Sequence, residues 1–306
     1  MDNLQPLQSL PGYAGWLFAF WMGAIVGSFL NVVVWRLPRG QSLNTPPSTC
    51  PKCGHRIMPW ENIPILSWLF LRGRCSQCHL PISWRYPAGE AAMGVLFCLA
   101  AHRVIRSGLP LETVVGAWWL AGSALTLARI DFEHRMIPDK VTYAGMAAAA
   151  ILALALPFGR AAIADPVPLH SGAIFAGRAL SAIREAIPGS PGTRMAALAD
   201  CMLGALAGAL IIAAARAIGN AYLKRLRKKG AAGLPEEAMG LGDLKMLAMT
   251  GAFLGADACV YITAAASMLA FFWCLIRNAG KNQPLSARSV AFAPFLAIPT
   301  LLWLVI

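Results

Sequence analysis

Long stretches without charged residues are the strongest constraint on the fold of this chain. Several approach the roughly 20 apolar residues that an α-helix needs to cross a hydrocarbon core about 30 Å thick. Backbone polar groups inside a bilayer must be satisfied within helices or closed barrels, and these stretches lack the period-two alternation of barrel strands. We place eight spans, at 13–34, 88–103, 112–130, 140–158, 195–218, 242–255, 257–276 and 289–306. The sequence therefore predicts an all-α polytopic membrane protein in contact with a lipid bilayer.

Positive charge is distributed unevenly between the segments that connect these spans. If the N-terminus lies outside, the inside segments together with the inner ends of the spans hold 20 of the 26 Lys and Arg residues. This asymmetry follows the positive-inside rule, and it accounts for the net charge of +12 without nucleic acid as a partner. Seven spans remain an alternative, because Gly251 and Gly255 interrupt the sixth, which is short.

Three segments are too polar to lie in the bilayer. The segment 35–87 is rich in Pro, Cys and Trp, and 159–194 carries small residues, prolines and glycines on the outer side. The third, 219–240, begins with a basic run on the inner side. We therefore expect a first transmembrane helix in 1–34, a cytoplasmic domain in 35–87, and a membrane-embedded core in 88–306 that includes the outer loop 159–194 and the basic inner loop 219–240.

Four of the eight cysteines form two C-x-x-C pairs, Cys50 with Cys53 and Cys75 with Cys78. Two tight turns that each present two thiolates can complete the tetrahedral shell of a zinc ion. The alternatives are two disulfides or a redox pair, but a reducing cytosolic face disfavours structural disulfides. Because protein ligands would fill all four positions, we expect a structural, closed zinc site.

Two aspartates, Asp131 and Asp243, stand out among the 14 acidic residues. Asp131 lies at the C-terminal end of the third span, where a negative charge opposes the helix dipole, although a salt bridge to a flanking arginine would also explain it. Asp243 follows Gly240 and Gly242 at the start of the sixth span. At such a position an Asp can also be a simple N-cap.

The predicted topology brings both aspartates to one face of the membrane, because the third span ends where the sixth begins. Two carboxylates within hydrogen-bonding distance share a proton, so one can activate water while the other protonates a peptide carbonyl oxygen. We interpret Asp131 and Asp243 as the dyad of an aspartic protease, and Asp139 as a helix-start residue. Two other classes stay open: an ion- or proton-coupled transporter that uses the two aspartates, and a membrane-anchored zinc module that binds a partner through 35–87.

Several motifs follow one another along the chain in order. They are Gly27-Ser28-Phe29-Leu30-Asn31, the two cysteine pairs, Asn62-Ile63-Pro64, Arg85-Tyr86-Pro87 with Glu90, Ile137-Pro138-Asp139, Gly240-Leu241-Gly242-Asp243 with Lys245, and Pro294-Phe295-Leu296-Ala297. Together they resemble the type IV prepilin peptidases, the leader peptidases and N-methyltransferases of type IV pilus and type II secretion systems. The chain departs from the family pattern in a longer segment at 159–194 and in Gly89, where a branched apolar residue is common.

The resemblance implies that Asp131 and Asp243 are catalytic and that Gly240 and Gly242 form the backbone motif of a GxGD peptidase. It also implies removal of a short basic leader from prepilin or pseudopilin precursors, followed by methylation of the new N-terminus with S-adenosylmethionine. The enzyme would lie in the bacterial inner membrane, with the zinc loop and the dyad at the cytoplasmic face.

A cofactor pocket cannot be placed from residues, because the chain lacks the glycine-rich fingerprint of soluble methyltransferases. The candidate substrate or methyl-transfer residues are Glu61, Glu90 and Lys245. Glu236 and Glu237, next to the basic run, are candidates for attracting the basic leader.

Overall fold

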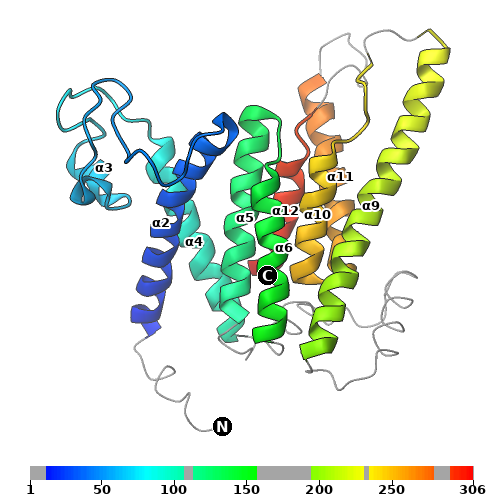
Figure 1. Ribbon diagram of the computed structural model, residues 1–306, viewed down its shortest axis with the longest axis horizontal. Helices are drawn as coiled ribbons and strands as arrows, with labels where there is room; N and C mark the ends of the chain where they lie inside the picture. Colours follow the sequence, from blue (N-terminus) through cyan, green and yellow to red (C-terminus); the bar gives the residue numbers. More distant parts are fainter. Residues whose placement is uncertain (1–11, 107–112, 157–193, 231–233, 279–289, 306) are drawn as a thin grey trace. The chain divides into compact units, whose positions relative to one another are not determined.

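The structure, a computed structural model, describes residues 12–106, 113–156, 194–230, 234–278 and 290–305 (Figure 1). These residues form helices joined by short connections, with two isolated β-bridges as the only extended pairing among them. The chain divides into two compact units, the first running to Arg103 and the second from Val104 to Leu304. The all-α fold predicted from the sequence is confirmed, whereas the expected outer loop lies outside the described residues except for Arg194.

The first unit contains two long helices, α2 (Gly12–Arg36) and α4 (Arg85–Arg106). The connection between them includes η1 (Leu37–Arg39), η2 (Pro59–Asn62) and the short α3 (Leu66–Phe70). Small residues let the two long helices approach: a Cβ built on Gly23 would lie 2.6 Å from the Met93 carbonyl oxygen. The packing continues at Gly27, where a Cβ would lie 2.9 Å from the Cα of Glu90.

The second unit is a bundle of helices around α10 (Leu241–Leu254). Its other helices are α5 (Thr113–His134), α6 (Asp139–Ala155), α9 (Arg194–Lys228), α11 (Ala256–Asn278) and α12 (Ala293–Val305). The central α10 contacts α5, α6, α9 and α11, and its residues from Met246 to Leu254 are buried. An apolar helix enclosed in this way needs little contact with lipid, although its 14 residues make it only about 21 Å long.

Five helices in the described part of the chain are long and apolar enough to cross a membrane. They cover Tyr13–Arg39, Arg85–Arg106, Thr113–His134, Ala197–Lys228 and Ala256–Arg277. The remaining three predicted spans coincide with α6, α10 and α12, which are shorter. The protein is therefore a multi-pass membrane protein, and the count of eight spans stays a prediction.

Close backbone contact joins α9 to α10. A Cβ on Gly204 would lie 2.0 Å from the Gly251 carbonyl oxygen, and one on Gly208 would lie 2.4 Å from that of Leu247. These distances leave no room for any side chain. Small residues at such positions let transmembrane helices pack tightly.

We expect Gly204→Ala to destabilise the protein, because the new methyl group must push the backbones of α9 and α10 apart. Overpacking of this kind costs about 1–3 kcal/mol. The measurement is the thermal unfolding midpoint in detergent. Gly15→Ala is the matched control, since a Cβ at Gly15 meets nothing within 4 Å and alanine is the better helix former. Equal unfolding midpoints for the two variants would contradict the tight helix contact.

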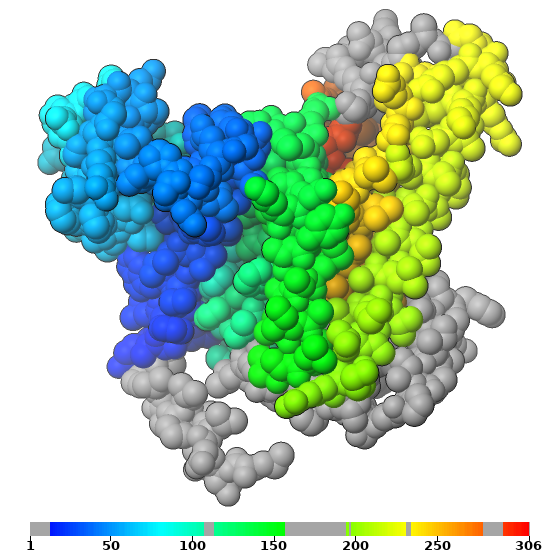
Figure 2. All heavy atoms as spheres, viewed as in Figure 1, coloured from blue at the N-terminus to red at the C-terminus, as the bar shows by residue number. Residues whose placement is uncertain are grey.

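The length of α9 exceeds the thickness of a bilayer. Its 35 residues make it about 52 Å long, against a hydrocarbon core of about 30 Å. Residues 219–228, expected in the basic inner loop, continue this helix. In Figure 2 the yellow C-terminal end of α9 projects beyond the ends of the green helices α5 and α6.

Candidate active site

Asp131 lies in the last turn of α5, and only 7% of it is exposed. Its Oδ2 atom accepts a hydrogen bond of 3.1 Å from the backbone N–H of Ala293, the first residue of α12. The first N–H groups of a helix lack partners within it, and the helix dipole there favours negative charge. The start of α12 therefore offsets the unfavourable position of Asp131 at the end of its own helix.

Asp243 lies in the first turn of α10 and is 8% exposed. Gly240 occupies the N-cap position of this helix, so Asp243 is not its N-cap residue. The backbone N–H of Gly240 instead interacts with the Asp243 carboxylate, as in the reciprocal half of a capping box. Gly240 thus occupies the N-cap position of α10, and Gly242 leaves room for the side chain of Ile137.

The two aspartates meet within the second unit. Helices α5 and α10 contact each other, and Asp131 lies near enough for its charge to act on Asp243. Two carboxyl groups that are buried together hold one shared proton more readily than two negative charges. Such a pair can activate water and protonate a carbonyl oxygen without a metal or a covalent nucleophile.

The turn between α5 and α6 supports the start of α10. A Cβ on Gly242 would lie 2.7 Å from the Cβ of Ile137, so the glycine lets this turn pack against the motif. Lys245 donates a 2.6 Å hydrogen bond to Asp139 Oδ1 and lies 5.4 Å from the centre of the Tyr143 ring. Lys245, a candidate for substrate binding or methyl transfer, is thus placed in a contact between α10 and α6. Asp139 is the first residue of α6.

The sequence does not predict one contributor to the site, the backbone N–H of Ala293. The last span was placed from 289, whereas α12 begins at Ala293. Pro294, in the first turn, was the available signal, because proline is enriched at the first position of a helix. Nothing in the local sequence connects that helix start with Asp131, which lies 162 residues earlier.

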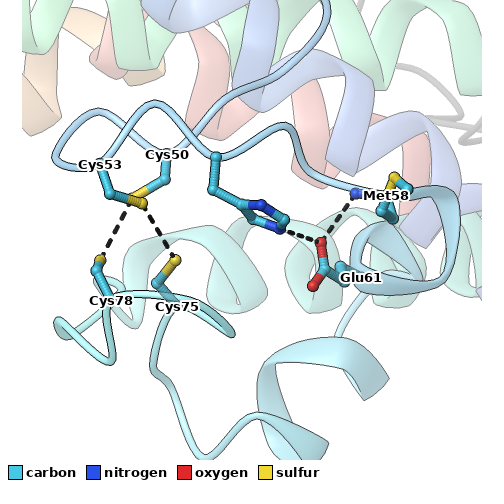
Figure 3. A network of polar contacts seen from close by, with 7 residues as sticks. Cys50, Cys53, Met58, Glu61, Cys75 and Cys78 are labelled. Atoms are coloured by element: carbon cyan, nitrogen blue, oxygen red, sulfur yellow. Dashed lines mark hydrogen bonds and ion pairs between the residues drawn. The ribbon is translucent and has the colours of Figure 1, made fainter.

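The structure brings all four cysteines of the two C-x-x-C pairs together in the first unit (Figure 3). Their sulfur atoms lie within 4.8 Å of one another, and none is in a disulfide. Cys50 and Cys78 are 3.9 Å apart, and Cys53 and Cys75 are 4.0 Å apart. Four sulfurs about 2.3 Å from a tetrahedral zinc ion would be about 3.8 Å apart. The cluster could therefore hold zinc.

The two cysteine turns have the same backbone design. Cys50 donates its N–H to the His55 carbonyl at 2.8 Å, and Cys75 donates to Leu80 at 3.0 Å. Each first cysteine also accepts an N–H bond from the residue four positions later, Gly54 or His79. Both of these residues have positive φ, 73° and 56°. Because both turns have the same backbone hydrogen bonds, each presents its two thiols in the same geometry.

Glu61 connects separate parts of the segment 35–87 through hydrogen bonds. Its Oε2 atom accepts the backbone N–H of Met58 at 2.9 Å and lies 3.1 Å from Nε2 of His55 (Figure 3). The Met58 N–H, together with the side chain of Ser76 from the second cysteine turn, lowers the pKa of the Glu61 carboxyl group. The ionised form therefore stabilises the loop above the ordinary carboxyl pKa, and this contribution is lost as the pH falls through the lowered value.

We expect Glu61→Gln to release zinc to a chelator faster than wild type at neutral pH. The amide is a weaker acceptor than the carboxylate, and hydrogen bonds to charged groups contribute about 1.5–3 kcal/mol. Glu133→Gln removes one negative charge from an exposed residue outside the loop and serves as the control. Identical zinc release by the Glu61 and Glu133 variants would show that Glu61 does not hold the loop together.

Glu90 connects the same loop to the long helices of the first unit. It is buried, and its Oε2 atom accepts the backbone N–H of Ile65 at 2.7 Å. The Ser28 side chain from α2 also hydrogen-bonds to it. Asn31 donates from Nδ2 to the carbonyl oxygen of Tyr86 at 3.2 Å. The motif around Ser28 and the motif before Glu90, far apart in sequence, are therefore adjacent in space.

The fold and the site define a class: a multi-pass helical membrane protein with a buried pair of aspartates and a four-cysteine loop. Residues 21–104 match the bacterial peptidase A24 N-terminal domain, and residues 118–275 match the type IV leader peptidase family. The chain therefore belongs to the type IV leader peptidase family.

Three relatives share the name prepilin leader peptidase/N-methyltransferase. The one from Myxococcus xanthus is 37% identical over 263 residues, which cover 85% of this chain and 63% of the relative. The one from Aeromonas hydrophila is 31% identical over 324 residues, 94% of this chain and 91% of the relative. The one from Burkholderia pseudomallei is 30% identical over 319 residues, 96% and 86% respectively. No solved structure matches the chain.

Proposed function

We propose that this protein is a membrane aspartic endopeptidase that removes the basic leader from type IV prepilins or type II secretion pseudopilins. The observation that carries this proposal is that two aspartates, Asp131 from α5 and Asp243 from α10, are both buried and lie near enough for the charge of one to act on the other. Membership of the type IV leader peptidase family agrees with it, and the relatives' names supply the substrate class. The same findings do not favour a transporter or an isolated zinc module.

In the proposed reaction, one carboxylate takes a proton from water as the water oxygen attacks the scissile carbonyl carbon. The other carboxyl group gives its proton to the carbonyl oxygen. As the peptide bond breaks, the proton taken from water passes to the leaving amine, and a hydroxyl proton of the intermediate returns to the second carboxylate. Both carboxylates accept a backbone N–H at a helix start, Asp131 from Ala293 and Asp243 from Gly240. Either aspartate can therefore act as the base while the other holds the shared proton.

The proposed site lies at the cytoplasmic face of the bacterial inner membrane, where the basic leader of the substrate would meet the dyad. The distribution of Lys and Arg supports this orientation. Of the two candidate leader-binding acids, Glu237 is paired with Arg216 at 2.5 Å, so we retain only Glu236 for that role.

We further propose that the protein methylates the new N-terminus, with S-adenosylmethionine as the methyl donor. The names of the relatives support this second activity. The donor's positive sulfonium would supply the methyl group, and Glu90, buried beside Ser28, is our first candidate for a methyl-transfer residue. We assign zinc to the four cysteines as a structural ion that orders the cytoplasmic domain 35–87, and cleavage to the core 88–306.

The test is incubation of the purified protein with a candidate prepilin, with and without S-adenosylmethionine, followed by mass spectrometry of the product's N-terminus. We expect loss of the leader in both reactions and one added methyl group only where the donor is present. An intact precursor would refute the peptidase proposal. A cleaved product that stays unmethylated would refute the second activity alone.

A further inference from the structure

The C-terminal end of α9 holds the segment 235–238, which we call the strap. Asn220 Oδ1 accepts the backbone N–H of Ala238 at 2.8 Å, and Arg216 pairs with Glu237 at 2.5 Å. Arg227 donates from Nη2 to the carbonyl oxygens of Pro235 at 2.5 Å and Glu236 at 3.0 Å. All four residues of the strap are therefore bonded to one helix, beside which the strap lies in Figure 1.

These contacts come from one face of α9. The residues involved, Arg216, Gly219, Asn220 and Arg227, recur at spacings of three, four and seven, and such spacings place side chains on one side of a helix. A Cβ on Gly219 would lie 2.5 Å from the Cβ of Ala238, so the strap packs directly on the helix backbone. Residues between them, such as Ile218, are exposed on another side. The spacing indicates that one side of α9 forms the contact surface for the strap.

The strap leads directly into the candidate active site. Ala238 is followed by Met239 and then by Gly240, the N-cap of α10, and Asp243 lies in the next turn. The same helix α9 also packs against the body of α10, through Gly204 and Gly208. A single helix thus holds both α10 and the segment that precedes it.

We infer that the C-terminal end of α9 is a positioning element for the reaction, in which Asn220 and Arg216 set the position of the Gly240–Asp243 backbone through the strap. This inference rests on the proposed function. A displacement of about 1 Å of a catalytic group can reduce turnover about a hundredfold. The two side chains act through the strap and touch neither substrate nor the reacting atoms.

The test compares Asn220→Ala with Asn220→Asp. Alanine removes the acceptor for the Ala238 N–H, so we expect faster hydrogen exchange in peptides covering 234–240. We also expect a loss in kcat of about ten- to a hundredfold, with KM nearly unchanged, because positioning affects the transition state and not the binding of the precursor. Aspartate keeps an acceptor oxygen at the same place, so both the exchange rate and kcat are expected to return towards wild type.

A charge exchange tests the second contact. Arg216→Glu alone places two carboxylates together and is expected to lower kcat, and adding Glu237→Arg should restore it. Arg225→Ala, an exposed residue on the same end of α9, is the matched control and should leave exchange and turnover unchanged.

Two results would overturn the inference: unchanged exchange of the strap in Asn220→Ala, or faster exchange with wild-type kcat. Failure of the wild-type protein to cleave any prepilin would instead refute the proposed function, and the catalytic role of the strap with it. The exchange measurements would still decide whether α9 holds the strap, so the two failures are distinguishable.

Discussion

Replacing either Asp131 or Asp243 with asparagine is expected to abolish leader cleavage while the protein remains folded. Removal of a positioned acid or base lowers turnover by about 10²–10⁴-fold, and each carboxyl group of a dyad depends on the other. Asparagine keeps an oxygen that can accept the Ala293 N–H, so Asp131→Asn preserves the contact with α12 and changes only the chemistry. Cleavage is measured on a prepilin in membranes or detergent, with the unfolding midpoint as the check on folding.

Asp139→Asn is the matched control for these two variants. Asp139 is an aspartate near the same end of the bundle, but its side chain is 56% exposed and pairs with Lys245. Exposed ion pairs contribute only about 0–1 kcal/mol, so this variant should be much milder. Substantial cleavage by a folded Asp131 or Asp243 variant would remove that residue from the proposed dyad.

Replacing Cys50 and Cys78 together with serine is expected to eliminate bound zinc and to reduce methylation. The two sulfurs are 3.9 Å apart and come from different turns, so their loss breaks the site on both sides. Structural zinc contributes about 10–16 kcal/mol to the folding of small metal-binding domains, which is far more than the other contacts of this loop can replace.

The measurement for the cysteine variant is metal analysis of freshly purified protein, followed by the methylation assay. Cys274→Ser, a cysteine outside the cluster, controls for the loss of a thiol. Wild-type protein without zinc would contradict the assignment of the metal. Full methylation by a zinc-free double variant would contradict its role in that activity.

The helical fold was predictable because apolar length is a property of sequence alone. Hydropathy found α2, α5 and α11 within a few residues. It placed the end of the fifth span at 218, ahead of the basic run that starts at Lys224, whereas α9 continues to Lys228. Hydropathy marks where a helix leaves the bilayer and not where it ends, and Leu, Lys and Arg are good helix formers in water.

The candidate site was predictable where it depends on spacing and on topology. The C-x-x-C spacing predicted the cysteine cluster, and the order of the spans predicted that Asp131 and Asp243 meet. The contacts that stabilise them were not predictable, because they join residues far apart in the chain. The bond from Ala293 to Asp131 and the bond from Ile65 to Glu90 involve backbone groups, whose partners depend on tertiary packing and not on residue type.

The most direct test of the paired aspartates is single-turnover cleavage of one purified prepilin by wild type, both single asparagine variants and the double variant, read as intact product mass. Residues that act as a unit give losses that do not multiply. We expect wild type to cut, and the double variant to lose no more activity than either single variant. Losses that multiply would mean that Asp131 and Asp243 act independently and would contradict a shared catalytic site.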